Sequence, residues 1–331
     1  MIARRRRRPL TLVTALALVA AGACSRGGGA TTARSTSSTS SSTAGATTST
    51  ASRLTTVALG GRPSAVAYAD GVLWVADDGS GQVQRVDART GAALGLPAAV
   101  GPSPVAIAVG GGRVWVAEAQ GTVDRLDATT GAAAGAPVVL GGALVDVVVD
   151  GGTVWVGDIA GGVVHALDPT TGAARRAAVA VPAGVVRLAV AGNELWVTGR
   201  DDQVTPIDRA TGAVGPAVRV GNGPIGLAPA GAALWVANGD DGTVSRIDPV
   251  DGHALGGTVA TGHAPVAVGP DGASLWVLDQ DGPDVVHLRA ADGHLLGAPV
   301  VLPMRPRGLA VTPFGIWVVG VDPPSAVLVP R

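Results

Sequence analysis

Charged side chains of two kinds are the residues of this sequence that could do chemistry. The acidic residues offer carboxylate oxygens, the ligands that Ca²⁺ and Mg²⁺ prefer. They are Asp77, Asp78, Glu118, Asp158, Asp201, Asp202, Asp240, Asp241, Asp279, Asp281, Asp284 and Asp322. The basic side chains offer groups for ligand binding and one imidazole that could act as a general base. They are Arg62, His263, Arg305 and Arg307. The sequence therefore raises two hypotheses, a binding surface and a catalytic site.

His263 is the one candidate for a catalytic residue, because the other four histidines, at 165, 253, 287 and 294, are expected away from the acidic residues. A lyase-type mechanism needs a general base beside a metal-bound electrophile. The two glutamates, Glu118 and Glu194, belong to repeats that are not adjacent to the repeat of His263. No Gly-x-Ser-x-Gly, phosphate loop or zinc-type cluster occurs. Binding is therefore favoured over catalysis.

Tryptophan marks the repeated elements that must position these side chains. Its seven occurrences, at residues 74, 115, 155, 196, 235, 276 and 317, are separated by 39 to 41 residues. A period near 40 carried by short apolar strands is typical of a β-propeller, with one blade per repeat. The repeat at 101–141 predicts strands at 104–109, 113–117, 122–127 and 136–140. We expect an all-β, seven-bladed β-propeller over residues 54–331, with each Trp packed between neighbouring blades.

A second repeated motif, Asp-x-x-Thr-Gly, predicts the turn between the third and fourth strands. It occurs at Asp87–Gly91, Asp127–Gly131, Asp168–Gly172 and Asp208–Gly212. An Asp at the start of a turn accepts backbone N–H groups two residues on, and Gly supplies the positive φ. The fifth repeat has Asp251 in place of Thr, and the sixth has Arg289 in place of Asp. We interpret these aspartates as structural.

The last repeat contains only three strands, since the chain reaches Arg331 without a fourth. Residues 54–60 form an additional strand before the first repeat. Pairing this strand with the last repeat would complete the seventh blade and protect its edge. The sequence therefore predicts a ring closed by an N-terminal strand.

The propeller architecture would bring the acidic and basic residues to one face. Loops that join the second strand to the third, and the fourth to the next first, gather there around the channel. The acidic residues fall in the former loops and the basic residues in the latter, which predicts an acidic rim with a basic sector. The competing interpretation is ordinary turn chemistry, since Asp beside Gly is common in hairpins. Because the acids are spread over seven blades, we expect no cofactor, with Ca²⁺ or Mg²⁺ as the alternative.

The N-terminal region predicts export and lipid anchoring. Basic residues Arg4–Arg8 precede an apolar stretch at Leu10–Ala23, the layout of a secretory signal peptide over residues 1–24. The stretch has 14 residues, short of the ~20 that a spanning helix needs. Cys24, the only cysteine, follows Ala-Gly-Ala and resembles the lipidated Cys of a bacterial lipobox. Residues 25–53 are rich in Ser, Thr, Ala and Gly, which predicts a disordered tether. We expect a lipoprotein on the outer face of the bacterial cell membrane.

The repeated string, LWVA followed by Gly-x-Val-x-Arg-Ile/Val-Asp-x-x-Thr-Gly, resembles the YVTN and YncE-like propellers of bacteria. More distantly it is similar to NHL-type propellers and virginiamycin B lyase. The first resemblance implies an extracytoplasmic binding module. The resemblance to the lyase implies, as the alternative, a metal-dependent lyase or hydrolase at the channel mouth, with a His base and a Mg²⁺ site.

Charge restricts the classes of partner. Residues 54–331 carry 16 Arg and 25 acidic residues, a formal net charge of −9. A domain this acidic lacks the basic surface that nucleic acids require. We expect a monomer that binds a protein, a peptide or a component of the cell envelope, and that meets the membrane through its lipid anchor.

Overall fold

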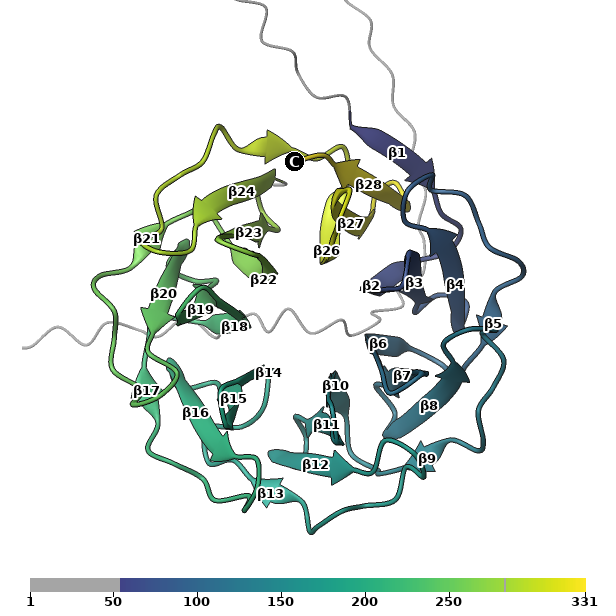
Figure 1. Ribbon diagram of the computed structural model, residues 1–331, viewed down its shortest axis with the longest axis horizontal. Helices are drawn as coiled ribbons and strands as arrows, with labels where there is room; N and C mark the ends of the chain where they lie inside the picture. Colours follow the sequence, from purple (N-terminus) through teal and green to yellow (C-terminus); the bar gives the residue numbers. More distant parts are fainter. Residues whose placement is uncertain (1–53, 283) are drawn as a thin grey trace, which may run out of the picture. The chain divides into compact units, whose positions relative to one another are not determined.

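The protein folds into seven four-stranded antiparallel sheets arranged around a common axis (Figure 1). The computed structural model describes residues 54–282 and 284–331, and these residues form strands and turns only. The predicted all-β, seven-bladed propeller is therefore confirmed. None of the described residues forms a helix with the length and apolar character needed to cross a membrane. The proposed signal peptide, Cys24 and the tether lie outside the described residues.

Each blade runs from an inner strand beside the axis to a short outer strand at the rim (Figure 1). The inner strands are β2 (Pro63–Ala69), β6 (Pro104–Gly110), β10 (Leu144–Asp150), β14 (Arg187–Ala191), β18 (Pro224–Ala230), β22 (Pro265–Asp271) and β26 (Arg305–Thr312). The second strands are β3 (Val72–Asp77), β7 (Arg113–Glu118), β11 (Thr153–Asp158), β15 (Glu194–Thr198), β19 (Ala233–Asn238), β23 (Ser274–Asp279) and β27 (Gly315–Val321). The third strands are β4 (Gln82–Asp87), β8 (Thr122–Asp127), β12 (Val163–Leu167), β16 (Gln203–Asp208), β20 (Thr243–Ile247), β24 (Asp284–Arg289) and β28 (Ser325–Val329). The outer strands are β5 (Ala98–Ala99), β9 (Val138–Val139), β13 (Val179–Ala180), β17 (Val218–Arg219), β21 (Val259–Ala260), β25 (Val300–Val301) and β1 (Thr55–Ala58).

The outer strands are shorter than the sequence predicts. In the second blade, a strand is expected at 136–140, whereas β9 spans two residues and pairs only with Thr122 and Val123. Gly135 has a φ of +113°, outside the range of a strand, and Pro137 has no N–H to donate to a ladder. The chain therefore joins the sheet only after Pro137. The other three strands of this blade match the prediction to within a residue.

The seventh blade takes its outer strand from the start of the domain. β1 pairs antiparallel with β28, from Thr55 opposite Leu328 to Ala58 opposite Ser325. The two strands lie side by side at the rim (Figure 1). The sequence predicted this pairing from the missing strand of the last repeat.

The seven tryptophans occupy equivalent positions in the second strands and are at most 4% exposed. Each packs against the next blade: Trp115, for example, belongs to one core cluster with Val154 and Val156 of β11. The prediction that Trp fills the space between blades is therefore confirmed.

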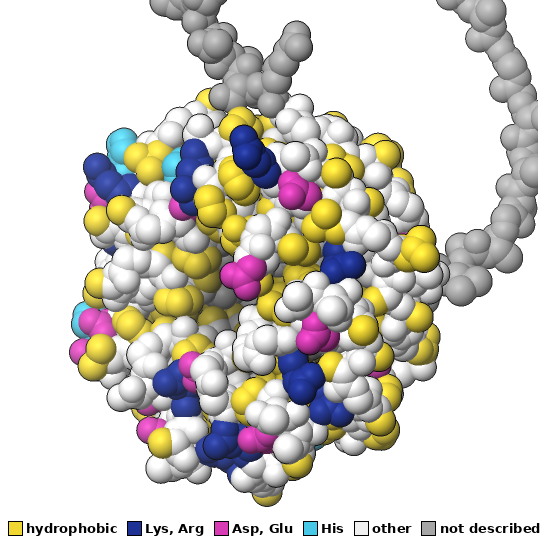
Figure 2. Space-filling view, turned by 45° about the vertical axis from the view of Figure 1, so that its right-hand side comes forward, with side chains coloured by type: hydrophobic (Ala, Val, Ile, Leu, Met, Phe, Trp, Pro, Cys, Tyr) yellow, Lys and Arg dark blue, Asp and Glu magenta, His cyan; other side chains and the backbone are white. Residues whose placement is uncertain are grey.

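On the face shown in Figure 2, hydrophobic side chains border a central hollow, with charged side chains of both signs scattered around it.

Arginines of the third strands add a link between blades that the repeat pattern alone does not reveal. Arg85 lies over the ring of Trp74, with its Cζ 5.9 Å from the ring centroid, and its Nη1 donates to the carbonyl oxygen of Thr129 in the next blade. Arg125 and Arg246 repeat this arrangement. The Arg in Gly-x-Val-x-Arg is thus structural, since it combines a cation–π contact with a hydrogen bond.

The Asp-x-x-Thr-Gly motifs form the turns that the sequence predicts. Oδ1 of Asp87 accepts hydrogen bonds from the backbone N of Arg89 and of Thr90, at 3.1 and 2.7 Å, and from Oγ1 of Thr90 at 2.7 Å. Gly91 follows with a φ of +75°. The Thr90 hydroxyl, followed by the backbone donors, lowers the pKa of Asp87 below its usual value. The turn motif therefore holds its aspartate in the ionised form.

Candidate functional site

Five of the twelve acidic residues of the predicted rim stabilise loops. Asp77, the last residue of β3, accepts hydrogen bonds at Oδ1 from the backbone N of Arg62 (2.9 Å), Gly79 (2.8 Å) and Ser80 (3.0 Å). The carboxylate thus holds its own loop and joins it to the loop that precedes β2. The structure places this residue at the end of a strand, not in the loop where it was expected.

Asp158 and Asp279 repeat this role in the third and sixth blades. Asp158 accepts from the backbone N of Ala143 at 2.9 Å, and Asp279 accepts from that of Ala264 at 3.1 Å. In the fifth blade, Asp241 accepts from both the backbone N and Nδ2 of Asn222, at 2.7 Å each. Asp202 accepts from Gly223. These five carboxylates stabilise turns and loops. Of the other predicted acids, Asp201, Asp240, Asp281 and Asp322 are exposed, and Asp284 is half-buried.

Glu118 is the exception in this series. It occupies the position of Asp77 in the second blade, yet it is fully buried and neither carboxyl oxygen has a hydrogen-bond partner among the described residues. Burial, reinforced by the neighbouring carboxylate of Asp124, raises its pKa to about 8. Glu118 is therefore protonated at neutral pH, and it is not a ligand on the surface.

The basic sector takes a different form from the prediction. Arg305 and Arg307 were expected in the loop before the last blade, whereas both belong to the inner strand β26. Arg307 sits at a β-bulge between Pro306 and Gly308. The corresponding bulges of other inner strands carry Ser64, Val105, Val145 and Val266. A charged side chain at this position is therefore particular to the seventh blade.

Arg307 has no acidic partner of its own. Its guanidinium makes no hydrogen bond or ion pair within the described part of the chain, and its Nε is buried. Burial lowers its pKa; Asp78 and Asp322 oppose this effect, whereas the nearby guanidinium groups of Arg305 and Arg62 add to it. We call these five residues the Arg307 cluster.

Asp78 is shared within the cluster. Its Oδ1 lies 3.4 Å from Nε of Arg62, and its side chain is 9% exposed. Burial raises the pKa of Asp78, while Arg62 and Arg307 act in the opposite direction. The buried carboxylate of Asp78 therefore interacts with the guanidinium groups of both Arg62 and Arg307, and Arg305 lies nearby. The cluster has an excess of hydrogen-bond donors and positive charge.

A pocket of about 500 Å³ adjoins this cluster between the sixth and seventh blades. Its lining comprises Gln280, Asp281, Leu302, Pro303, Met304, Arg305 and Asp322. Leu302 and Met304 are nearly fully buried, and the exposed Pro303 between them provides apolar surface. Arg305 and Asp322 belong to both the pocket and the Arg307 cluster, so the two form one continuous candidate site. Of the predicted residues, the structure brings together Arg62, Asp78, Asp281, Arg305, Arg307 and Asp322.

His263 does not form a catalytic group with the predicted acids. It is exposed, and its backbone N donates to the carboxylate of Asp279. The carboxylate that interacts electrostatically with its imidazole is that of Asp284. Burial and the charge of Asp279 raise the pKa of Asp284, whereas His263 acts in the opposite direction. Glu118 and Glu194 lie in the second and fourth blades. The structure therefore assembles no base and metal-ligand set around His263 within the described residues.

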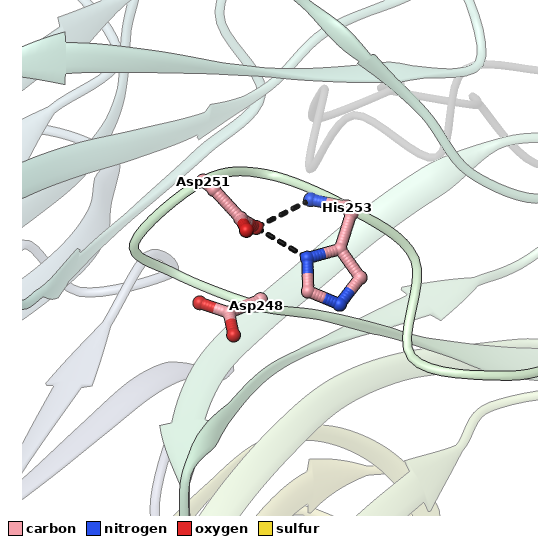
Figure 3. Close-up of side chains that lie close together, drawn as sticks. All are labelled: Asp248, Asp251 and His253. Atoms are coloured by element: carbon pink, nitrogen blue, oxygen red, sulfur yellow. Dashed lines mark hydrogen bonds and ion pairs between the residues drawn. The ribbon is translucent and has the colours of Figure 1, made fainter.

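Three potential metal ligands do converge elsewhere. Asp248, Asp251 and His253 lie in the hairpin between β20 and β21 (Figure 3), and one ligand atom from each lies within 4.8 Å of the others. No other group of three such side chains occurs in residues 54–282 and 284–331. The turn motif alone indicates a structural role for this hairpin. The signal was present, because this repeat has Asp where four others have Thr.

Comparison with known proteins identifies the architecture. No protein-family model and no curated protein sequence matches the chain. Virginiamycin B lyase from Staphylococcus aureus superposes with a TM-score of 0.74 at 15% identity, over 84% of this chain and 99% of the lyase. Hydrazine synthase from Kuenenia stuttgartiensis gives 0.70 at 16% identity, over 83% and 97%. BamB from Moraxella catarrhalis gives 0.58 at 23% identity, over 80% and 82%. At these identities the likeness concerns the fold alone: the chain is a seven-bladed β-propeller whose fold is similar to the structures of virginiamycin B lyase and BamB.

Proposed function

We propose that this protein is an exported, lipid-anchored, non-enzymatic binding module that recognises a protein, a peptide or an envelope component through the Arg307 cluster. The supporting observation is the half-buried Arg307 guanidinium, which has no partner among the described residues. Partial burial of a charge costs free energy unless hydrogen bonds compensate. A bound carboxylate or phosphate would supply those bonds, since guanidinium presents donors in the geometry that these anions match.

The adjoining pocket narrows the class of ligand. The exposed ring of Pro303, between Leu302 and Met304, offers apolar surface beside Arg305, so a ligand with an apolar side chain next to an anionic group would satisfy both parts of the site. A segment of a peptide or protein has this combination. Arg is also prominent among residues that dominate binding energies at protein interfaces.

The N-terminal residues support the part of the proposal that concerns export and anchoring. The signal-peptide pattern of residues 1–24 and the lipobox-like position of Cys24 support a lipid anchor outside the cell membrane. The composition of residues 25–53 supports a tether with a reach of about 30 Å. A propeller held in this way would meet its partner at the membrane surface.

The alternative is a metal-dependent lyase or hydrolase, as the name of virginiamycin B lyase suggests for a neighbour of the same fold. This alternative predicts that Mg²⁺ or Ca²⁺ binds near His263. A saturable rise of the unfolding midpoint with one of these ions, lost in His263→Ala, would support it, because a ligand of the folded state stabilises by mass action.

A matched pair of small probes tests the binding proposal. N-acetyl-leucine and N-acetyl-leucinamide share an apolar side chain and differ in the negative charge. We expect the carboxylate to bind more tightly than the amide in titrations followed by NMR. Arg307→Gln should weaken carboxylate binding about tenfold or more, the range of a lost charged hydrogen bond, while leaving the amide unaffected. Equal affinities of the two probes would contradict the proposal. So would an affinity for the carboxylate probe that Arg307→Gln leaves unchanged.

A further inference from the structure

Equivalent turns join the third strand to the outer strand in successive blades, so the turn of the fifth blade can be compared with the others. The proposed function does not use this turn. In the first, second and third blades, the first Asp of the motif accepts two backbone N–H bonds and one Thr hydroxyl bond at Oδ1. Asp208 of the fourth blade accepts one of each kind, both from Thr211. The residue after the Gly is always Ala in these turns: Ala92, Ala132, Ala173 and Ala213.

The fifth blade changes both of these positions. Asp251 replaces the Thr and His253 replaces the Ala, whereas Asp248 keeps the first position. The Asp248 carboxylate then accepts one hydrogen bond among the described residues, from the backbone N of Val250 at 2.8 Å. Because a carboxylate cannot donate to another, Asp251 takes away the donor that Thr supplies elsewhere. Asp248 is consequently left with unused acceptor capacity.

The sixth blade has the same Asp-Gly-His sequence, but its aspartate has a different partner. Arg289 stands in the first position and forms a paired contact with Asp292, Nε to Oδ1 at 2.8 Å and Nη2 to Oδ2 at 2.6 Å. A cation therefore faces the carboxylate in that turn. In the fifth blade the corresponding pair is two carboxylates, and no Arg forms an ion pair with either of them in the described part of the chain.

The missing Arg and the added imidazole, which contacts Asp251, point to a bound metal ion. Figure 3 shows Asp251 turned toward the ring Nδ1 of His253, with Asp248 beside the same ring. We propose that Asp248, Asp251 and His253 bind a divalent first-row transition-metal ion, represented by Zn²⁺, with water completing the coordination. Imidazole nitrogen together with carboxylate oxygen suits Zn²⁺, whereas Mg²⁺ and Ca²⁺ prefer oxygen ligands alone. The exposed position suits an ion exchanged with the surroundings.

The neighbouring turns supply variants that should fold. Asp251→Thr and His253→Ala each restore the residue that four other blades carry at that position, and His294→Ala is the matched control in the sixth blade. Isothermal titration of the full chain with Zn²⁺ measures the affinity of each. We expect one saturable site in the unaltered chain and in His294→Ala. Either fifth-blade variant should bind at least about tenfold more weakly, since even outer-shell changes cost 10- to 100-fold.

Repeating the Zn²⁺ titration in the presence of Ca²⁺ checks the selectivity. We expect Ca²⁺ to leave the affinity for Zn²⁺ unchanged when both are present, because the imidazole is a poor ligand for Ca²⁺. Equal Zn²⁺ affinities in the unaltered chain, Asp251→Thr and His253→Ala would overturn the proposal, as would the absence of saturable Zn²⁺ binding.

Discussion

The indole Nε1 of Trp317 in the last blade donates a hydrogen bond to the carbonyl oxygen of Ala88 in the first blade, over 2.7 Å. The two residues are 229 positions apart in the sequence, and both are completely buried. The indole N–H groups of Trp115, Trp155, Trp196 and Trp235 are also buried but have no partner among the described residues. The boundary between the last and first blades therefore carries a polar contact that these four tryptophans lack.

Trp317→Phe should destabilise the fold more than Trp196→Phe does. Both changes remove buried surface, but only the first also leaves the Ala88 carbonyl oxygen buried without its donor. An unsatisfied buried acceptor costs about 1–3 kcal/mol, so we expect the two losses in the free energy of unfolding to differ by this amount. Urea unfolding of the two variants measures it, and equal losses would show that the hydrogen bond contributes nothing to ring closure.

Deleting residues 54–60 should destabilise the propeller far more than deleting residues 25–50. The first deletion removes β1 and leaves the edge of β28 unpaired, while Leu59 and Val57 leave the core cluster that contains Trp317. Thermal unfolding of the two truncated chains measures the difference. Similar midpoints would mean that β1 is dispensable for closure.

Glu118 should make the fold less stable as the pH rises. Its pKa is about 8 in the folded protein, above its ordinary value of 4.5. Between these values the folded state retains a proton that the unfolded state has released, so the free energy of unfolding falls as the pH rises from about 4.5 to 8. Glu118→Gln carries no titratable proton and should lack this contribution. We expect the unaltered chain to lose stability relative to the variant between pH 5 and pH 8, measured by urea unfolding; parallel pH profiles would contradict it.

Cys24→Ala should release the protein from the membrane. If Cys24 carries the lipid, its replacement leaves an exported chain without an anchor. Cell fractionation should then find the variant in the soluble extracytoplasmic fraction, and labelled palmitate should enter the unaltered chain only. A variant that stays with the membrane would show that the attachment has another basis.

The fold could be predicted because its determinants are local and repeated. The Trp period, the Asp-x-x-Thr-Gly turns and the strand missing from the last repeat each follow from residue types at fixed spacing. The outer strands were overestimated because pairing at the rim depends on backbone geometry at residues such as Gly135, not on apolar character.

The candidate site was predictable only in part, because hydrogen bonding in three dimensions decides the role of each charge. Asp77 and Glu118 occupy equivalent positions and are both acidic, yet one accepts three backbone N–H groups and the other none. In the second blade, Asp124 accepts the backbone N–H of Gly101, and burial together with this neighbouring carboxylate raises the pKa of Glu118. The sequence offers Arg307 as a candidate, but its place at a bulge in β26, where it faces no acid of its own, depends on strand register.

Site-specific photo-crosslinking in intact cells tests the central claim most directly. A photoreactive residue at Pro303, exposed in the pocket beside the Arg307 cluster, is compared with one at Leu96, a side chain that is 90% exposed outside the site. We predict a discrete adduct from position 303 that is absent from position 96, is lost in Arg307→Gln and returns in part in Arg307→Lys. An adduct from position 303 that is unchanged by Arg307→Gln, or equal adducts from both positions, would contradict recognition through this cluster.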